Sequence, residues 1–245
     1  MKTIDAQGVY YKQLNETIRS EIRSGTKKFR LINVVGQRYI GGGLEDPDVQ
    51  IEIEGVPGED LAAFMDGPTL VVRNNAQDGV GNTMNRGKIL VHGMAGDVVG
   101  YGMRGGKIYI RDDVGYRVAI HMKGYLEHVP IMVIGGNAGN FFGEYMAGGV
   151  VVLLGATTKG GPIVGDYCAT GMHGGVIYIR GDVDERLLGK EVKKFSLDKE
   201  DQKRLIPILR EFNHDLHLSL EVFNFSDYIK LLPVSARPYG RMYVY

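Results

Sequence analysis

The chain has 245 residues, enough for one or two domains, and 44% of them are hydrophobic, an ordinary share for a globular protein. Lysine and arginine together number 29, as do aspartate and glutamate, so the formal net charge is zero. A neutral chain offers no electrostatic argument for binding nucleic acid or an anionic membrane surface, so we expect neither partner.

Nothing in the sequence indicates export or membrane insertion. No apolar run approaches the roughly 18 residues that span a bilayer, and residues 1–5 lack the apolar stretch of a signal peptide. Cys168 is the single cysteine, which excludes an internal disulfide. We therefore expect a cytoplasmic protein.

The first predicted element is a helix over residues 10–24. Tyr11, Leu14, Ile18 and Ile22 stand at helical spacing, and Gly25 follows them as a natural C-terminal stop. The region after this helix is a series of repeats. Because the end of a stack of repeats exposes unpaired backbone groups, we expect the helix to act as a cap.

Methionines mark the repeated unit. Four follow one another at identical intervals and two more at slightly longer ones, as expected for the same unit with short insertions. The six are Met65, Met84, Met103, Met122, Met146 and Met172. After most of them come a glycine or proline and then two apolar residues at alternate positions. These pairs are Leu70/Val72, Ile89/Val91, Ile108/Ile110, Val151/Leu153 and Ile177/Ile179. A fixed period of about 20 residues is typical of a solenoid.

One unit fits less well. After Met122, the positions of the glycine and the apolar pair are taken by Tyr125, Glu127 and Val129. The interval that separates the first four methionines also extends the pattern upstream, to the pairs Ile51/Ile53 and Ile32/Val34. We therefore expect the repeats to run from about residue 30 to about residue 185.

Each unit predicts one short strand. Ile108 and Ile110 alternate with Lys107, Tyr109 and Arg111, and this period of two predicts a strand with one buried face. Glycine, aspartate and asparagine between the strands turn the chain. Strands that recur at a fixed interval stack in parallel, so the predicted fold class is all-β, a parallel β-helix. We expect the methionines to fill its core rather than bind a soft metal, because no cysteine or histidine ligands accompany them.

The C-terminal part differs in composition, since glycine nearly disappears after Lys190 and charged residues increase. A solvated helix is predicted from about Leu197, disturbed by Pro207. An alternating, strand-like pattern follows at Leu216, Leu218, Leu220 and Val222. The stretch 228–233 and the last tyrosines, Tyr239, Tyr243 and Tyr245, are too apolar for a free tail. The predicted organisation is a helical cap over 1–28, a β-helix over 29–189 and a tail over 190–245 that packs on the solenoid or on a partner.

Sequence features that resemble functional motifs predict no active site. Gly100, Gly102 and Gly105 match the G-x-G-x-x-G dinucleotide pattern, but a strand rather than a helix follows them. Cys168 stands beside the core register without an activating neighbour, so a packed thiol is favoured over a nucleophile. The histidines, His92, His121, His128, His173, His214 and His217, share no metal-ligand spacing.

Aspartates recur at one place in the repeat, at Asp78, Asp97 and Asp166. Stacked charges of one sign repel one another, so we expect these side chains to accept hydrogen bonds from backbone N–H groups of the turns. The sequence therefore predicts no catalytic, cofactor-binding or metal-binding residue.

Several strings resemble the G-x-G-x-G domain at the C-terminus of the glutamate synthase large subunit. They are residues 96–110 (GDVVGYGMRGGKIYI), 143–155 (GEYMAGGVVVLLG) and 170–179 (TGMHGGVIYI), together with the closing Leu231-Leu232-Pro233 and Tyr239. The resemblance covers about residues 30 to 240. It implies a right-handed parallel β-helix, in agreement with the periodicity.

The family enzyme makes glutamate from glutamine and 2-oxoglutarate. Its amidotransferase domain uses an N-terminal cysteine, and its flavin barrel carries an iron–sulfur cluster. This chain begins with Met1, one cysteine cannot supply the cluster's ligands, and a barrel needs about 200 residues by itself. The resemblance thus implies a non-catalytic structural subunit of an archaeal-type split glutamate synthase, without a cofactor of its own. A glutamine amidotransferase subunit and an FMN and iron–sulfur synthase subunit are the implied partners, and self-association stays open.

Two alternatives stay open on the same fold. One of the subunits of formylmethanofuran dehydrogenase is also similar to this domain, and it would be a scaffold in a different complex. A free-standing β-helix protein that binds a ligand would need a groove lined by carboxylates and aromatic residues on adjacent coils. Tyr178 and Arg180 alternate with Ile177 and Ile179 as Tyr109 and Arg111 do with Ile108 and Ile110. The predicted outward residues, Lys107, Tyr109, Arg111, Tyr178 and Arg180, include aromatic residues but no stacked acids.

Overall fold

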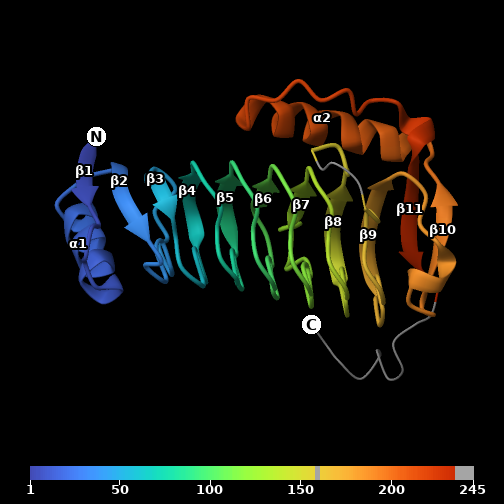
Figure 1. Cartoon of the computed structure of the whole chain (residues 1–245), viewed down its shortest axis with the longest axis horizontal. Helices are drawn as coiled ribbons and strands as arrows, with labels where there is room; N and C mark the ends of the chain where they lie inside the picture. Colours follow the sequence, from blue (N-terminus) through green and yellow to red (C-terminus); the bar gives the residue numbers. More distant parts are fainter. Residues whose placement is uncertain (158–160, 235–245) are drawn as a thin grey trace.

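The centre of the computed structural model is a stack of parallel strands, each paired with the next one along the chain (Figure 1). The structure describes residues 1–157 and 161–234, so Tyr239, Tyr243 and Tyr245 lie outside the described residues. The parallel strands are β1 Lys2–Asp5, β2 Lys28–Val35, β3 Gln50–Val56, β4 Asp66–Val72, β5 Arg86–Val91, β6 Lys107–Ile110, β7 Ile131–Ile134, β8 Ala147–Leu153 and β9 Gly174–Arg180. The predicted parallel β-helix is confirmed.

Equivalent residues of successive strands form ladders in the core. Ile89 of β5 pairs with Ile108 of β6, and Val91 pairs with Ile110 in the same register. The six methionines of the row and the five predicted strand pairs all have side chains that are fully buried. Burying one such side chain stabilises the fold by roughly 1.5–3 kcal/mol, so the repeat itself supplies most of the core. The predicted core of the repeats is confirmed.

The upstream end of the ladder was predicted in the wrong register. Strand β2 enters the ladder through Phe29 and Leu31, not through Ile32 and Val34. Along the chain, the interval from Phe29 to its partner Ile51 is longer than the interval from Ile51 to its partner Leu70. Because the first coil is longer, a fixed interval points to the wrong pair.

The irregular unit after Met122 contains an inserted hairpin. Tyr125 and His128 form an isolated antiparallel bridge within it, and their side chains are exposed. Strand β7 begins after the hairpin, where Met132 and Ile134 take the two buried core positions. The insertion shifts the apolar pair along the chain and leaves the order of the stack intact.

Both ends of the stack are covered. At the N-terminal end, helix α1 (Tyr11–Arg23) buries Leu14 and Ile18 in the same core as the strands. At the other end, β11 (Tyr228–Pro233) pairs antiparallel with β9, and β10 (Val192–Ser196) pairs antiparallel with β11. Two short 3-10 helices, η1 (Glu185–Leu187) and η2 (Phe225–Asp227), connect these pieces.

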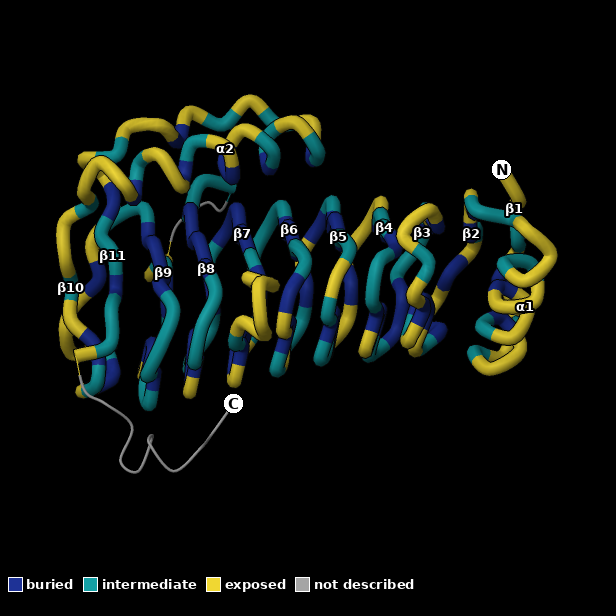
Figure 2. Tube along the Cα trace, turned by 180° about the vertical axis from the view of Figure 1, so that it is seen from behind, coloured by how far each residue is buried: buried dark blue, intermediate teal, exposed yellow. Residues whose placement is uncertain are grey.

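Helix α2 (Lys199–Asp215) lies across the outer face of strands β5 to β9 (Figure 1). Asp198 caps its N-terminus in a capping box with Asp201, and Pro207 lies inside the helix without ending it. The side that faces the strands is buried and the far side is exposed (Figure 2). No helix in the described parts of the chain is long and apolar enough to cross a membrane.

This helix overturns three expectations about the outer face. It is not solvated all round, since Leu205, Leu209 and Phe212 are buried against the strands. Tyr109 and Tyr178 point out of the solenoid core, as predicted, but α2 buries both completely. The residues Leu216 to Val222 form no strand; Leu216 and Val222 pack into the same second core as α2.

Candidate functional site

Each coil contains a turn segment in which every second residue has a positive φ angle. In the segment that ends at Met146, the φ angles of Phe141, Gly143 and Tyr145 are 62°, 70° and 52°. The backbone N–H groups of Glu144 and Met146 donate to the carbonyl oxygens three residues earlier. A positive φ at the third residue of a turn is the hallmark of type II turns, so two such turns overlap in each segment.

We call the six methionines of the row the ladder methionines. Before each of them, the fifth, third and first residues have positive φ angles. The triplets are Asp60/Ala62/Phe64, Gly79/Gly81/Thr83, Val98/Gly100/Gly102, Arg117/Ala119/His121, Phe141/Gly143/Tyr145 and Tyr167/Ala169/Gly171. Gly100, part of the apparent dinucleotide pattern, is therefore the middle of a structural turn. The middle residue is always glycine or alanine because it faces the core, where a Cβ on Gly143 would lie 2.5 Å from Cδ1 of Ile177.

Hydrogen bonds between coils fix the direction of each residue in the segment. The N–H groups of Phe141 and Tyr145 donate to carbonyl oxygens of the next coil, at 2.8 and 2.9 Å. The N–H group of Gly143 donates to the carbonyl oxygen of Val118 in the preceding coil, at 2.8 Å. With the middle residue turned inward, the first and last residues of each triplet face solvent, and those that are not glycine direct their side chains outward.

Several of these outward side chains are aromatic and stack across neighbouring coils. The rings of His121 and Tyr145 are 5.4 Å apart and 10° from parallel, and those of Phe141 and Tyr167 are 5.0 Å apart at 13°. The guanidinium group of Arg117 lies 4.6 Å from the centre of the Phe141 ring. Residues from three successive coils thus form one exposed aromatic surface, which the sequence pattern alone did not reveal.

A corner lined by acidic and amide side chains runs beside the aromatic residues. Asp78 accepts a hydrogen bond from the backbone N–H of Asp97, and Asp97 accepts one from Tyr116, both at 2.8 Å. Asn140 does the same for the N–H of Asp166 at 3.0 Å. The expectation that these aspartates bind backbone N–H groups is confirmed for Asp78 and Asp97. The backbone N–H groups that donate these hydrogen bonds belong to the next coil, so the bonds also hold the stack together.

We define the turn face as the sixth, fifth, second and first residues before each of the six ladder methionines. Its acidic residues are Glu59, Asp60, Asp78, Asp97, Glu144 and Asp166, and Arg117 is its single lysine or arginine. Arg117 is paired with Glu144 at 2.7 Å. By its own residues the turn face therefore carries an excess of five negative charges, although the whole chain is neutral and Arg38 of the preceding coil pairs with Glu59.

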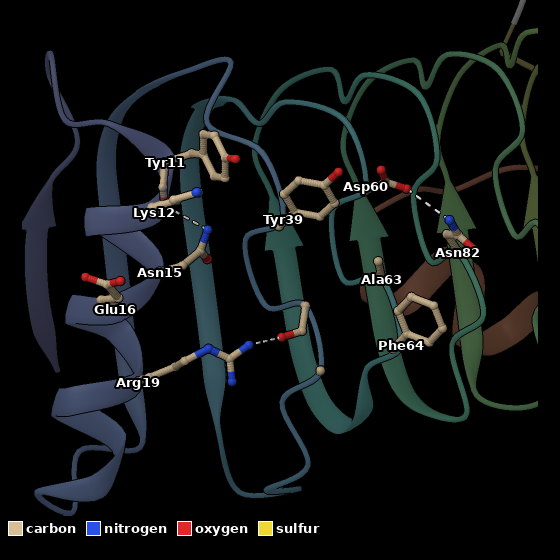
Figure 3. Close-up of a pocket in the computed structure, with 12 residues that line it drawn as sticks. Tyr11, Lys12, Asn15, Glu16, Arg19, Tyr39, Asp60, Ala63, Phe64 and Asn82 are labelled. Atoms are coloured by element: carbon tan, nitrogen blue, oxygen red, sulfur yellow. Dashed lines mark hydrogen bonds between the residues drawn. The ribbon is translucent and has the colours of Figure 1, made fainter.

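A hollow of about 560 Å³ lies at the N-terminal end of the turn face, between α1 and the first turn segments (Figure 3). Tyr11, Tyr39 and Phe64 form its aromatic wall, and the Tyr11 and Tyr39 rings are 5.8 Å apart. The side-chain amide of Asn82 donates to Asp60 at 3.0 Å on the far side. The hollow thus combines aromatic rings with the carboxylates of Glu16 and Asp60, a lining that suits the binding of a small polar molecule.

Sequence reasoning missed this hollow because its walls come from separate elements. The α1 side supplies Lys12, Glu16 and Arg19, and Arg19 donates a hydrogen bond to the carbonyl oxygen of Gly42. The aromatic residues that would signal it in the sequence, Tyr39 and Phe64, stand in the outward positions of two different turn segments. The recurrence of aromatic residues at these positions was the available signal.

A cluster of charged residues joins α2 to the strands. Lys88 is 2.6 Å from Glu211 and 2.7 Å from Asp215, and the hydroxyl of Tyr109 donates to Glu211 at 3.1 Å. Burial raises the pKa of Glu211, but hydrogen bonds from Lys107 and Lys88 outweigh it and the pKa is lowered. The cluster has its charges matched and fastens the helix.

Cys168 is fully buried in the core, and burial raises the pKa of its thiol to about 12. A thiol with this pKa is not a nucleophile at neutral pH, in agreement with the packed thiol expected from the sequence. His92 lies 3.0 Å from Arg73, and its ring is near that of His217. Among the residues that the structure describes, no histidine, cysteine or acid cluster could hold a metal ion. The expectation of no catalytic, cofactor-binding or metal-binding residue stays a prediction.

The chain resembles known proteins over most of its length. It is 48% identical over 250 residues to an uncharacterized protein of Methanocaldococcus jannaschii, covering 98% of this chain and 95% of that one. It is 30% identical over 186 residues to the ferredoxin-dependent glutamate synthase 2 of Synechocystis sp., covering 67% of this chain but 11% of that much longer protein. The family model of the GXGXG motif matches residues 11–230. The chain therefore belongs to the GXGXG motif family.

Proposed function

We propose that the chain is a non-catalytic structural subunit of a glutamate synthase, the enzyme that makes glutamate from glutamine and 2-oxoglutarate. The observation that carries the proposal is the match to a ferredoxin-dependent glutamate synthase across 67% of this chain. The subunit would hold a glutamine amidotransferase subunit and an FMN and iron–sulfur synthase subunit in register. It would act in the cytoplasm, in ammonia assimilation.

The physical character of the fold supports a scaffold. Each coil is joined to its neighbours by strand pairing, by the turn segments and by side chains such as Asp78 and Asp97. A solenoid tied at every coil is stiff along its length and offers long faces for partners. Cys168, the single cysteine, is buried with a raised pKa, which does not suit nucleophilic release of ammonia.

Affinity purification of the tagged chain from its native cells tests the proposal, with the bound proteins identified by mass spectrometry. The proposal predicts recovery of a glutamine amidotransferase subunit and an FMN and iron–sulfur synthase subunit in matched amounts. Recovery of molybdenum or tungsten formyl-dehydrogenase subunits instead would contradict it and favour the scaffold of a formylmethanofuran dehydrogenase.

The hollow beside α1 favours a second candidate, a free-standing protein that binds a small molecule. Tyr39, Asp60 and Phe64 place a carboxylate and aromatic rings on adjacent coils, and the volume of about 560 Å³ suits a small ligand. A thermal-shift screen of the purified chain against amino acids, sugars and nucleotides tests this candidate. A ligand whose stabilisation disappears in Phe64→Ala, but not in Thr83→Ala, would support it.

A further inference from the structure

The turn face exposes aromatic side chains that a free solenoid has no need to expose. Tyr101, Tyr116, Tyr145 and Tyr167 have exposed fractions of 42%, 55%, 46% and 58%. The stacking of His121 with Tyr145 links two of the coils into one surface. Contiguous exposed aromatic patches of this kind mark protein–protein contact sites, where tyrosine is enriched.

The backbone conformation is unfavourable for these aromatic residues. Phe141, Tyr145 and Tyr167 all have positive φ angles, a conformation that costs a bulky residue on the order of 1–3 kcal/mol. Glycine adopts it without that cost, and Gly102 and Gly171 stand at the same repeat position as Tyr145 in other coils. Aromatic rings therefore stand at places where glycine would serve the fold better, which points to a role outside the fold.

The charge of the turn face indicates what it binds. Its excess of five negative charges on a neutral chain attracts a basic surface and repels a second copy of itself. The exposed rings also offer sites for arginine side chains, as Arg117 already shows by lying over Phe141.

We propose that the turn face is the docking surface for a protein partner that presents arginine or lysine together with apolar side chains. The inference rests on the proposed function, and it assigns this face to one of the two glutamate synthase subunits. The domain matched in the Synechocystis protein is 11% of a longer chain, which agrees with a fold that has other protein beside it.

Two sets of variants separate binding from folding. Tyr145→Gly with Tyr167→Gly removes two rings at positive-φ positions, where glycine is the residue the backbone favours. Thr83→Gly is the matched control, since Thr83 has the same repeat position as Tyr145 and no ring. We expect both variants to remain folded, and only the double variant to lose affinity, by roughly 30-fold or more if these rings are central anchors.

Asp78→Asn, Asp97→Asn and Asp166→Asn together remove three negative charges while preserving the hydrogen bonds of the corner. Asn140 shows that an asparagine at this place still accepts the N–H of the next coil. We expect the triple variant to bind roughly tenfold more weakly at low salt, and the difference from wild type to shrink at high salt, because screening removes the charge attraction.

The experiment measures binding of the purified full-length chain to the purified amidotransferase subunit and to the FMN and iron–sulfur subunit of glutamate synthase from the same cells. The inference predicts that wild type binds one of them and that the ring and charge variants lose this affinity while Thr83→Gly keeps it. Wild type binding neither subunit would overturn the proposed function and the inference together.

Two further outcomes would overturn the inference alone. Equal affinities of wild type and both sets of variants would show that the subunits dock on another face. Wild type that sediments as a dimer, and a double tyrosine variant that sediments as a monomer, would show that the turn face binds a second copy of the chain.

Discussion

The hydroxyl group of Tyr178 donates a 2.6 Å hydrogen bond to the carboxylate of Asp201, and this bond ties strand β9 to the first turn of helix α2. Asp201 also accepts the backbone N–H of Asp198 at 2.9 Å, as part of the capping box. One buried carboxylate therefore starts the helix and positions it on the solenoid. A matching bond at 3.1 Å from Tyr109 to Glu211 holds the other end of the helix.

Removing the hydroxyl of Tyr178 should destabilise the protein. Tyr178→Phe leaves the ring in place but takes away a hydrogen bond to a buried charge, which we expect to lower the free energy of unfolding by about 2 kcal/mol. Urea unfolding followed by circular dichroism measures the change. The control is Tyr109→Phe, for which a smaller loss is expected because its bond is longer; a larger loss there would contradict this account of the helix.

The attachment of α2 should weaken in acid. Burial raises the pKa of both Glu211 and Asp215. Hydrogen bonds from Lys107 and Lys88 to Glu211, and from Lys88 and His214 to Asp215, outweigh burial, so both pKa values are lowered. A carboxylate whose pKa is lower in the folded than in the unfolded protein stabilises the fold fully at pH values above its unfolded-state pKa, which is 4.5 for glutamate and 3.8 for aspartate. This stabilisation is lost as the pH falls from there through the folded-state pKa.

Melting temperatures measured across the acid range test this attachment. Wild type should lose stability as the pH drops through these values, and Glu211→Gln should lose less over the same interval because one of the titrating groups is gone. Identical pH profiles for the two proteins would show that Glu211 does not contribute to the acid sensitivity.

The methionine row should behave as a packed core. Met103→Ala leaves a cavity in the centre of the stack, so we expect it to lower the free energy of unfolding by about 2–5 kcal/mol. Met103→Leu keeps the volume and should cost less than about 1.5 kcal/mol. Denaturant unfolding of both variants distinguishes a packed row from a row of metal-binding thioethers. In a metal-binding row, leucine and alanine would lower the free energy of unfolding equally when the metal is present.

Glycines that follow the ladder methionines should tolerate no side chain. Gly87 has a φ of 101°, and a Cβ there would overlap the carbonyl oxygen of Pro68, which cannot move without breaking the ladder. We expect Gly87→Ala to cost about 3 kcal/mol. Gly143→Ala meets only the flexible end of Ile177, and Ala119 occupies the same position in another coil, so about 1 kcal/mol is expected. Equal losses of melting temperature would contradict this difference.

The solenoid could be predicted from the sequence because the residues that form its core recur at a constant interval along the chain. A constant spacing places Met84 and Met103 in adjacent coils and pairs Ile89 with Ile108, so the period alone identifies the buried residues. The prediction was wrong at Ile32 because the first coil is longer, and it could not place the pair after Met122 because a hairpin is inserted there. A fixed interval carries no information about coils of other lengths.

Contacts between distant parts of the chain escaped prediction for a different reason. The burial of Tyr109 and Tyr178 depends on a helix that begins at Lys199, and no periodic pattern links the two regions. The turn face escaped because its aromatic residues are scattered along the sequence. The alternating positive φ angles and the hydrogen bonds between coils, as at Phe141 and Tyr145, show that these side chains point outward together.

The most direct test of the scaffold role is the rate at which the amidotransferase and FMN subunits, supplied with glutamine and an electron donor, reduce 2-oxoglutarate to glutamate, measured as consumption of 2-oxoglutarate with and without this chain. The account predicts no consumption of 2-oxoglutarate by the chain alone and a higher rate from the three subunits together than from the other two, because on this account the chain would hold the two catalytic subunits in register for the transfer of ammonia. Equal rates with and without the chain, or turnover of glutamine by the chain alone, would contradict it.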